Sequence, residues 1–205
     1  MHRYCIVKTI VANLYKEPSF SSELSTQALL REKLSILEER GNWYRVQQWD
    51  NYQSWIHKFY LMDKNIDFSN GWDNLKLKKK SINELLSYAK SFVSVPYLWG
   101  GKSSLGFDCS GLIQTVFKMS GINMPRDTYQ QITKKGLLEI NYNNAKPGDL
   151  LFFSENKNVN HVAICIGNEE IIHSSGCVKI ENLKKNKNLY KKLYKVMSVR
   201  NIINE

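Results

Sequence analysis

A cysteine at the junction between a glycine-rich loop and an apolar helix is the residue best placed to do chemistry. Residues 97–111 read YLWGGKSSLGFDCSG, and the apolar residues that follow recur at helical spacing until Gly121. Asp108 is then the expected N-cap and Cys109 the first helical residue. Free backbone N–H groups and the positive end of the helix dipole favour a thiolate there. We therefore expect Cys109 to be a nucleophile rather than a buried packing residue.

Two of the four histidines lie in a predicted β-hairpin that could supply the base. His161 begins an apolar run, His173 ends the next one, and Gly167-Asn168 separates the runs. Antiparallel pairing would bring both imidazoles side by side at one sheet edge. If the cysteine helix packs across this sheet, His161 can accept the thiol proton while His173 orients the His161 ring. The backbone N–H of the cysteine and a neighbouring donor would hold the oxyanion.

A zinc site is the main alternative for these side chains, since one cysteine and two histidines are also typical zinc ligands. The sequence offers no obvious fourth ligand, and Asp108 points away if it caps the helix. We therefore expect no metal and no cofactor. The four cysteines have no CxxC spacing, and we expect all of them to be reduced. We expect His2 and His57 to be structural, and Cys165 and Cys177 to be buried packing residues.

Length and composition limit the classes of function. The chain has 205 residues, 42% hydrophobic, with a formal net charge of +10. Its lysine clusters lack the recognition pattern of a nucleic-acid binder, so we expect no nucleic-acid partner. No apolar run reaches about 18 residues, which argues against a membrane span. The first residues carry no secretory signal, so the expected location is the cytoplasm, and we assume a monomer.

Turn signals divide the chain into two predicted domains joined by a linker. Residues 1–62 contain five short apolar runs, which predict a small β-barrel with strands at 6–10, 25–30, 33–38, 43–47 and 54–56. Residues 63–80 are polar, end in three lysines and form the predicted linker. Residues 81–205 show helical patterns first and strand patterns later, which is typical of an α+β domain.

Capping signals place the helices of the second domain. A capping box, Ser81 to Glu84, predicts a helix over 82–93, and Asp127 predicts a short helix that ends at Gly136. Strands are then expected at 150–153, 161–166, 170–174 and 194–202.

Five motifs in register resemble the NlpC family of papain-like peptidoglycan cysteine peptidases. They are YLWGG, FDCSG, PRDT, PGDL and HVAI, followed by Ile172-His173, and they cover about 82–180. The cues of the N-terminal barrel resemble the bacterial SH3-like domain, although Arg31 and Ser54 stand where glycine is common. The resemblance implies a Cys109–His161–His173 triad.

The resemblance also implies substrate-binding residues. The pairing of an SH3-like domain with this catalytic domain resembles the γ-D-glutamyl-L-diamino-acid endopeptidases that trim released wall peptides. In such enzymes acidic and tyrosyl groups hold the free amine of L-Ala, which matches Asp127 with Thr128 beside it, and Tyr97 in the cleft. The expected set also includes Glu32 and Tyr52 from the barrel, and Asp108 and Ser110 beside the cysteine. A carboxylate facing an ammonium would favour peptides with a free amino terminus over acetylated or sugar-linked ones.

The sequence thus predicts a cytoplasmic cysteine endopeptidase that cleaves the γ-D-Glu to diamino-acid bond of murein peptides with a free N-terminal L-Ala. One alternative is a hydrolase that acts on crosslinks or stems of the intact wall. Another is a non-catalytic wall-binding or adaptor protein that works through its SH3-like domain.

Overall fold

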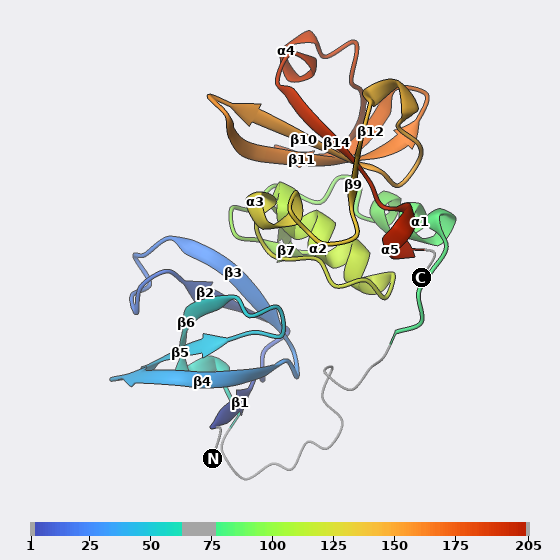
Figure 1. The fold of residues 1–205 in the computed structure, drawn as a ribbon. Helices are drawn as coiled ribbons and strands as arrows, with labels where there is room; N and C mark the ends of the chain where they lie inside the picture. The colour runs from blue at the N-terminus through green and yellow to red at the C-terminus, as the bar shows by residue number, and fades with distance from the viewer. Residues whose placement is uncertain (1–2, 63–76, 204–205) are drawn as a thin grey trace. The chain divides into compact units, whose positions relative to one another are not determined.

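The computed structural model describes residues 3–62 and 77–203, which form two compact units (Figure 1). One unit contains the N-terminal barrel together with Trp99–Ser103, and the other contains Leu77–Leu98 and the chain from Ser104 on. The predicted division at 62 and 81 therefore missed a short segment of the second domain that groups with the barrel. Most of the predicted linker, 63–76, lies outside the described residues.

The N-terminal unit is a six-stranded antiparallel sheet in the order β1-β4-β5-β6-β2-β3. Its strands are β1 (Tyr4–Ile6), β2 (Val11–Tyr15), β3 (Leu24–Leu29), β4 (Lys33–Arg40), β5 (Trp43–Gln47) and β6 (Gln53–His57), followed by the 3₁₀ turn η1 (Lys58–Tyr60). Strand β2 was not predicted. The prediction instead ran one strand from 6 to 10, whereas the chain leaves β1 at Ile6 and Ile10 is exposed.

The barrel core explains the alternating pattern that predicted these strands. Apolar side chains from β2 to β6, with two from the adjoining segments, form one buried cluster, namely Val7, Ala12, Leu14, Ala28, Leu34, Tyr44, Val46, Ile56 and Leu61. The two departures from the family pattern have different outcomes. Arg31 adopts φ 66°, a left-handed conformation that favours glycine, whereas Ser54 is a buried residue of β6 paired with Val46 rather than a turn residue.

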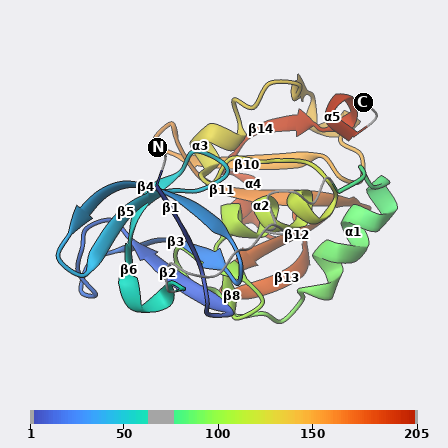
Figure 2. The same cartoon turned by 90° about the horizontal axis from the view of Figure 1, so that it is seen from below.

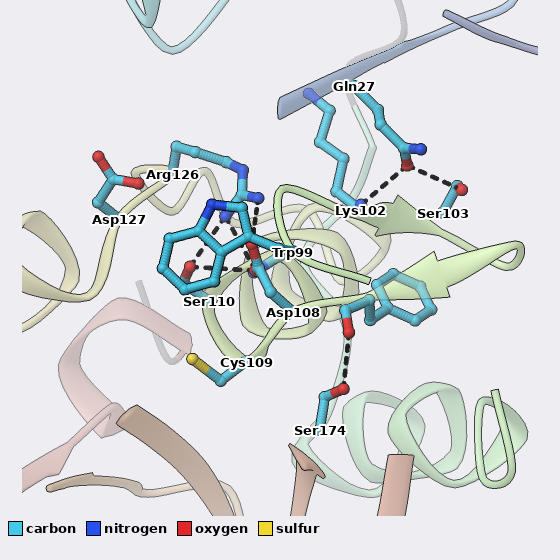
Figure 3. A network of polar contacts seen from close by, with 12 residues as sticks. Gln27, Trp99, Lys102, Ser103, Asp108, Cys109, Ser110, Arg126, Asp127 and Ser174 are labelled. Carbon is cyan, nitrogen blue, oxygen red and sulfur yellow. Dashed lines mark hydrogen bonds and ion pairs between the residues drawn. The ribbon is translucent and has the colours of Figure 1, made fainter. Parts of the chain in front are cut away.

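Hydrogen bonds fix the segment Trp99–Ser103 within the first unit. The Gln27 side-chain oxygen accepts from the Lys102 N–H at 3.1 Å and from the Ser103 hydroxyl at 3.0 Å (Figure 3). Gly100 has φ +75°, and a Cβ there would lie 2.6 Å from the carbonyl oxygen of Leu24. Only glycine permits this close approach of the two backbones.

The second unit pairs an antiparallel sheet with α1, α2 and α3 on one face and the short helix α4 on the other (Figure 1), and Figure 2 gives a second view of it. The sheet order is β13-β12-β11-β10-β14-β9. Its strands are β9 (Leu138–Ile140), β10 (Leu150–Glu155), β11 (Asn158–Gly167), β12 (Glu170–Ser175), β13 (Cys177–Asn182) and β14 (Leu193–Ser198). The helices are α1 (Ile82–Ser91), α2 (Cys109–Met119), α3 (Thr128–Gln131), α4 (Lys187–Tyr190) and α5 (Arg200–Ile203), with the 3₁₀ turn η3 (Tyr142–Asn144). The short strands β7 (Lys102–Ser103) and β8 (Gly106–Phe107) precede α2.

Two apolar clusters hold this unit together. The larger one packs α1 and α2 against the sheet, with Leu85, Leu112, Ile113, Phe117, Phe152, Val162, Ile164 and Ile172 among its buried members. The smaller one contains Leu151, Phe153, Ala163, Cys165, Ile171, Leu183 and Val196. Cys165 is therefore a buried packing residue, as predicted, whereas Cys177 is only half-buried.

Most predicted elements of this unit are present, with three differences. The capping box between Ser81 and Glu84 opens α1, which ends at Ser91. Helix α3 has four residues and stops well before Gly136, and the predicted strand 194–202 divides into β14 and α5. Strands β9 and β13 were not predicted. Within the described residues, every helix is too short or too polar to cross a membrane.

Candidate active site

Cys109 occupies the first position of α2, as the capping signal predicted. Asp108 is the N-cap, and its Oδ1 accepts from the Gly111 N–H at 2.6 Å. Gly106, just upstream, is required by packing, because a Cβ there would lie 2.5 Å from the Cβ of Leu98. The loop and the cap together fix where the cysteine enters the helix.

A buried arginine holds this cap in place through hydrogen bonds. Arg126 donates from Nη2 to Asp108 Oδ2 at 2.5 Å, and from Nη1 to Asp108 Oδ1 at 3.0 Å and to the Ser110 hydroxyl at 2.8 Å (Figure 3). Its side chain is only 2% exposed. The oxygens of Asp108 and Ser110 are thus bonded within the protein, which gives both residues a structural task. Their predicted contact with substrate stays a prediction, and Arg126 was quoted in a motif without a role.

The thiol of Cys109 lies against the backbone on both sides of His161. Its Sγ is 3.9 Å from the Asn160 carbonyl oxygen, and the N–H of Val162 faces the sulfur. Figure 3 shows the thiol directed away from the network of Asp108 and Arg126. Burial, followed by the charge of Asp108, raises the pKa of Cys109 to about 12, although the backbone N–H groups of Val162 and Ser110 oppose that rise. Desolvation therefore opposes the thiolate that the start of the helix was expected to favour, and we expect a thiol in the resting protein.

His161 and His173 contact each other directly. The distance from His161 Nε2 to His173 Nδ1 is 2.7 Å, and the ring centroids lie 5.0 Å apart. Strands β11 and β12 pair with Ile164 opposite Ile172, joined by a two-residue turn at Asn168 and Glu169 with φ 52° and 63°. Both histidines lie inside their strands rather than at the ends, and β13 covers β12, so the pair does not occupy a free sheet edge.

The unpredicted strand β13 brings two charged residues to this pair. Glu181 Oε1 lies 2.9 Å from His173 Nε2, and Lys179 Nζ lies 3.6 Å from Glu181 Oε2. Burial, then the neighbouring His173 and Lys179, lowers the pKa of His161 to about 3. Burial also lowers the pKa of His173, and Lys179 adds to this, whereas Glu181 raises it. Both imidazoles are therefore neutral at pH 7.

Ser174 links the histidine strands to the cysteine segment. Its hydroxyl donates to the Phe107 carbonyl oxygen at 2.7 Å, and both residues are buried (Figure 3). This hydrogen bond joins β12, the strand that carries His173, to the chain two residues before Cys109. No sequence signal had singled out this serine.

Besides Asp108 and Ser110, three predicted substrate residues lie in this unit. Tyr97 is 37% exposed, and burial followed by the nearby Cys109 raises its pKa to about 12, which places its hydroxyl in the electrostatic surroundings of the thiol. Thr128 donates to the Val159 carbonyl oxygen at 3.0 Å and so holds α3 beside β11. Asp127, the N-cap of α3, is half-buried and donates its N–H to Gln130 Oε1 at 3.3 Å. Their contact with substrate stays a prediction.

The two barrel candidates differ from each other. Glu32 is 5% exposed, and its carboxylate accepts from the Leu29 N–H at 3.0 Å and from Gln48 Nε2 at 2.6 Å. It is thus a buried acceptor that holds the turn between β3 and β4. Tyr52 is half-buried, and its backbone N–H donates to Asp50 Oδ1 at 3.1 Å. A substrate role for either residue stays a prediction.

Across residues 3–62 and 77–203, no three His, Cys, Asp or Glu side chains are grouped so as to hold a metal ion. Three of the four ring nitrogens of the pair already face a partner: His161 Nε2 and His173 Nδ1 face each other, and His173 Nε2 faces Glu181. The arrangement suits proton transfer along a line of hydrogen-bonding groups that starts beside a thiol.

A small β-barrel followed by an α+β domain with a cysteine at a helix start and a histidine pair defines a papain-like enzyme scaffold with an SH3-like domain. Two family models match the chain: the NlpC/P60 family over residues 94–198, and the bacterial dipeptidyl-peptidase SH3 domain over residues 14–58. The chain belongs to the NlpC/P60 family, which confirms the resemblance inferred from its motifs.

Curated relatives point in the same direction. A gamma-D-glutamyl-L-lysine dipeptidyl-peptidase of Bacillus cereus is 31% identical over 178 residues, which are 83% of this chain and 49% of the relative. The Bacillus subtilis protein of that name is 36% identical over 119 residues, 56% of this chain and 40% of the relative. A probable endopeptidase p60 of Listeria innocua is 37% identical over 48% of this chain and 21% of its own length. The chain thus spans half the length or less of these three relatives.

Solved structures share the fold. An NlpC/P60 family protein from Bacillus cereus superposes with a TM-score of 0.55 at 26% identity. The match covers 95% of this chain and 62% of the Bacillus cereus chain. The NlpC/P60 domain of the peptidoglycan hydrolase SagA superposes with a TM-score of 0.51 at 29% identity, over 58% of this chain and 99% of that domain. These likenesses confirm the predicted fold class.

Proposed function

We propose that this protein is a cysteine endopeptidase that cleaves the γ-D-Glu to diamino-acid bond of murein peptides with a free N-terminal L-Ala. The observation that carries the proposal is the contact between His161 and His173 beside the thiol of Cys109. The names of the two Bacillus relatives support the bond that would be cleaved. No cofactor is required by this chemistry.

Acylation begins from neutral partners. His161 takes the proton from the Cys109 thiol as the sulfur attacks the γ-carbonyl carbon of D-Glu, so the thiolate forms only during attack. The backbone N–H of Cys109, which has no partner within the helix at the first position of α2, is the candidate oxyanion donor. Protonated His161 then gives its proton to the amine of the diamino acid, which leaves as the carbon–nitrogen bond breaks.

Hydrolysis of the thioester completes the cycle. A water molecule attacks the γ-carbonyl carbon while His161 accepts one of its protons, and the carbon–sulfur bond breaks. The proton returns to sulfur, and the products are L-Ala-γ-D-Glu and the freed diamino acid or the peptide that it begins. His173 holds the His161 ring through Nε2 in both half-reactions.

Preference for a free amine would come from Asp127, the half-buried carboxylate at the start of α3. An ammonium facing this carboxylate gains a charge-assisted hydrogen bond, which an acetylated amine cannot supply. Such a preference favours released peptides over the intact wall and is consistent with peptide recycling in the cytoplasm, the location that we propose.

A defined peptide tests this proposal. We expect the wild-type protein to split L-Ala-γ-D-Glu-L-Lys or its diaminopimelate counterpart into the dipeptide and the diamino acid, as seen by mass spectrometry. The Cys109→Ala protein should give no product, and the N-acetylated peptide should react at least tenfold more slowly. Equal rates on both peptides would remove the amine preference, and absence of product from either peptide would overturn the proposal.

A wall hydrolase is the second candidate function, because a relative named probable endopeptidase p60 matches 48% of this chain and the NlpC/P60 domain of the peptidoglycan hydrolase SagA matches 58%. Activity on intact sacculi without activity on the free tripeptide would support it. If function in the cell survives Cys109→Ala, the protein acts as a wall-binding adaptor instead.

A further inference from the structure

A carboxylate contacts His173 at the ring nitrogen that does not face His161. Glu181 Oε1 is 2.9 Å from His173 Nε2 and accepts from Asn186 Nδ2 at 3.0 Å, while Lys179 Nζ lies 3.6 Å from Oε2. Its side chain is 23% exposed, whereas that of His173 is 2% exposed. Glu181 thus joins a buried imidazole to more accessible polar groups.

The contact with Glu181 discriminates between the two neutral forms of His173. If the hydrogen were on Nδ1, the lone pair of Nε2 would face a carboxylate oxygen at 2.9 Å, which is repulsive. A hydrogen on Nε2 faces that oxygen favourably, although the N–H is bent away from the line between the two atoms, so the contact is one between a charge and a dipole rather than a straight hydrogen bond. The carboxylate therefore selects the form of His173 that is protonated at Nε2.

The tautomer of His173 in turn determines the tautomer of His161. With its hydrogen on Nε2, His173 can only accept at Nδ1, so the 2.7 Å contact requires a hydrogen on His161 Nε2. The nitrogen of His161 that remains to accept a proton is Nδ1, beside the backbone that contacts the Cys109 thiol. We propose that Glu181 is a positioning residue that sets both histidine tautomers and so makes His161 Nδ1 the base toward Cys109.

The surrounding charges fit this arrangement. Within the part of the chain that the structure describes, the charged groups that act on the pair are Lys179 and Glu181, both from β13. Lys179 lowers the pKa of both histidines, and Glu181 opposes it at His173. Removal of the carboxylate would therefore leave a positive charge unopposed and make His161 a poorer base.

Nitrogen NMR of the ¹⁵N-histidine-labelled protein tests the tautomers without any assay of activity. We expect both His161 and His173 to carry their hydrogen on Nε2 in the wild type, and His173 to shift toward Nδ1 in Glu181→Leu. A wild-type His173 with its hydrogen on Nδ1 would overturn the proposal, and so would an unchanged His173 in a folded Glu181→Leu protein. The wild-type spectrum decides even if that variant does not fold.

Kinetics on the peptide adds a second readout, which rests on the proposed function. We expect Glu181→Leu to lose about 10- to 100-fold in kcat with little change in KM, which is a part of the roughly 10²- to 10⁴-fold that general base catalysis contributes. Glu181→Gln keeps an acceptor oxygen, so it should lose about fivefold or less and shift the acidic limb of the kcat profile to lower pH. Glu155→Leu, which removes an exposed partner of Lys192, is the matched control and should change neither.

The two failures are distinguishable. If the wild type cleaves no peptide, the proposed function fails while the NMR result still decides the tautomers. If the wild type is active and Glu181→Leu keeps its kcat and pH profile, Glu181 has only a structural role and this inference is wrong.

Discussion

Arg126 and Asp108 form a buried bidentate ion pair under the first turn of α2, with nitrogen–oxygen distances of 2.5 and 3.0 Å. Because the Arg126 side chain is 2% exposed, loss of its partner leaves a charge without compensation. We expect Arg126→Met or Asp108→Asn to lower the free energy of unfolding of the second unit by about 3–5 kcal/mol. Urea denaturation measures this, with the exposed Lys195–Glu139 pair as control.

The control substitution, Lys195→Met, should change the same free energy by about 1 kcal/mol or less, since exposed pairs are screened by water. Arg126→Lys should not restore stability, because an ammonium cannot reproduce the forked contact with both carboxylate oxygens. Equal effects of Arg126→Met and Lys195→Met would contradict the structural role assigned to the buried pair.

The resting state of Cys109 gives a second prediction. Burial raises its pKa to about 12, so at pH 7 the free protein should hold a thiol. We expect the rate of alkylation of Cys109 by iodoacetamide to rise continuously from pH 6 to pH 10. Mass spectrometry of the labelled peptide measures this rate. Thiolate absorbance, taken as wild type minus Cys109→Ala, should likewise be absent at pH 7. An alkylation rate that has already levelled off by pH 7 would show a preformed thiolate.

The sequence predicts the site only as far as local signals extend. Asp108 and Cys109 follow from capping and apolar spacing, and the turn after Gly167 predicts the hairpin. Glu181 could not be predicted, because β13 is a short strand that mixes polar and apolar residues. The contact between Glu181 and His173 depends on the register between β13 and β12. Desolvation of the thiol is likewise a tertiary effect, since it depends on β11 packing against the helix start.

The depressed pKa of His161 makes stability depend on pH. Its pKa is about 3 in the folded protein against an ordinary value of 6.5, so the unfolded chain takes up the proton first as pH falls. The stabilising contribution is therefore complete above pH 6.5 and is lost progressively down to pH 3. We expect the free energy of unfolding to fall less between pH 6.5 and pH 3 in His161→Gln than in the wild type, by about 1 kcal/mol or more.

Hydrogen exchange of core amides in β11, measured on wild type and His161→Gln from pH 7 to pH 4, reports this difference for the second unit. His57, a barrel histidine whose pKa burial lowers as well, serves as the control. His57→Gln should leave the exchange of β11 amides unchanged at every pH. Parallel pH dependence in wild type and His161→Gln would show that the folded His161 titrates near its ordinary value.

Arg31 provides a prediction for the barrel, where a non-glycine residue adopts φ 66°. A Cβ in this left-handed conformation costs about 1–2 kcal/mol, and glycine does not incur that cost. Because the Arg31 side chain makes contacts of its own, the informative comparison is between Arg31→Gly and Arg31→Ala. We expect the glycine variant to be about 1 kcal/mol more stable than the alanine variant in thermal unfolding of the barrel. Lys33, which begins strand β4, is the control: there the alanine variant should be more stable than the glycine variant, because glycine weakens a strand. If Arg31→Ala is as stable as Arg31→Gly, or more stable, the turn is not strained at position 31.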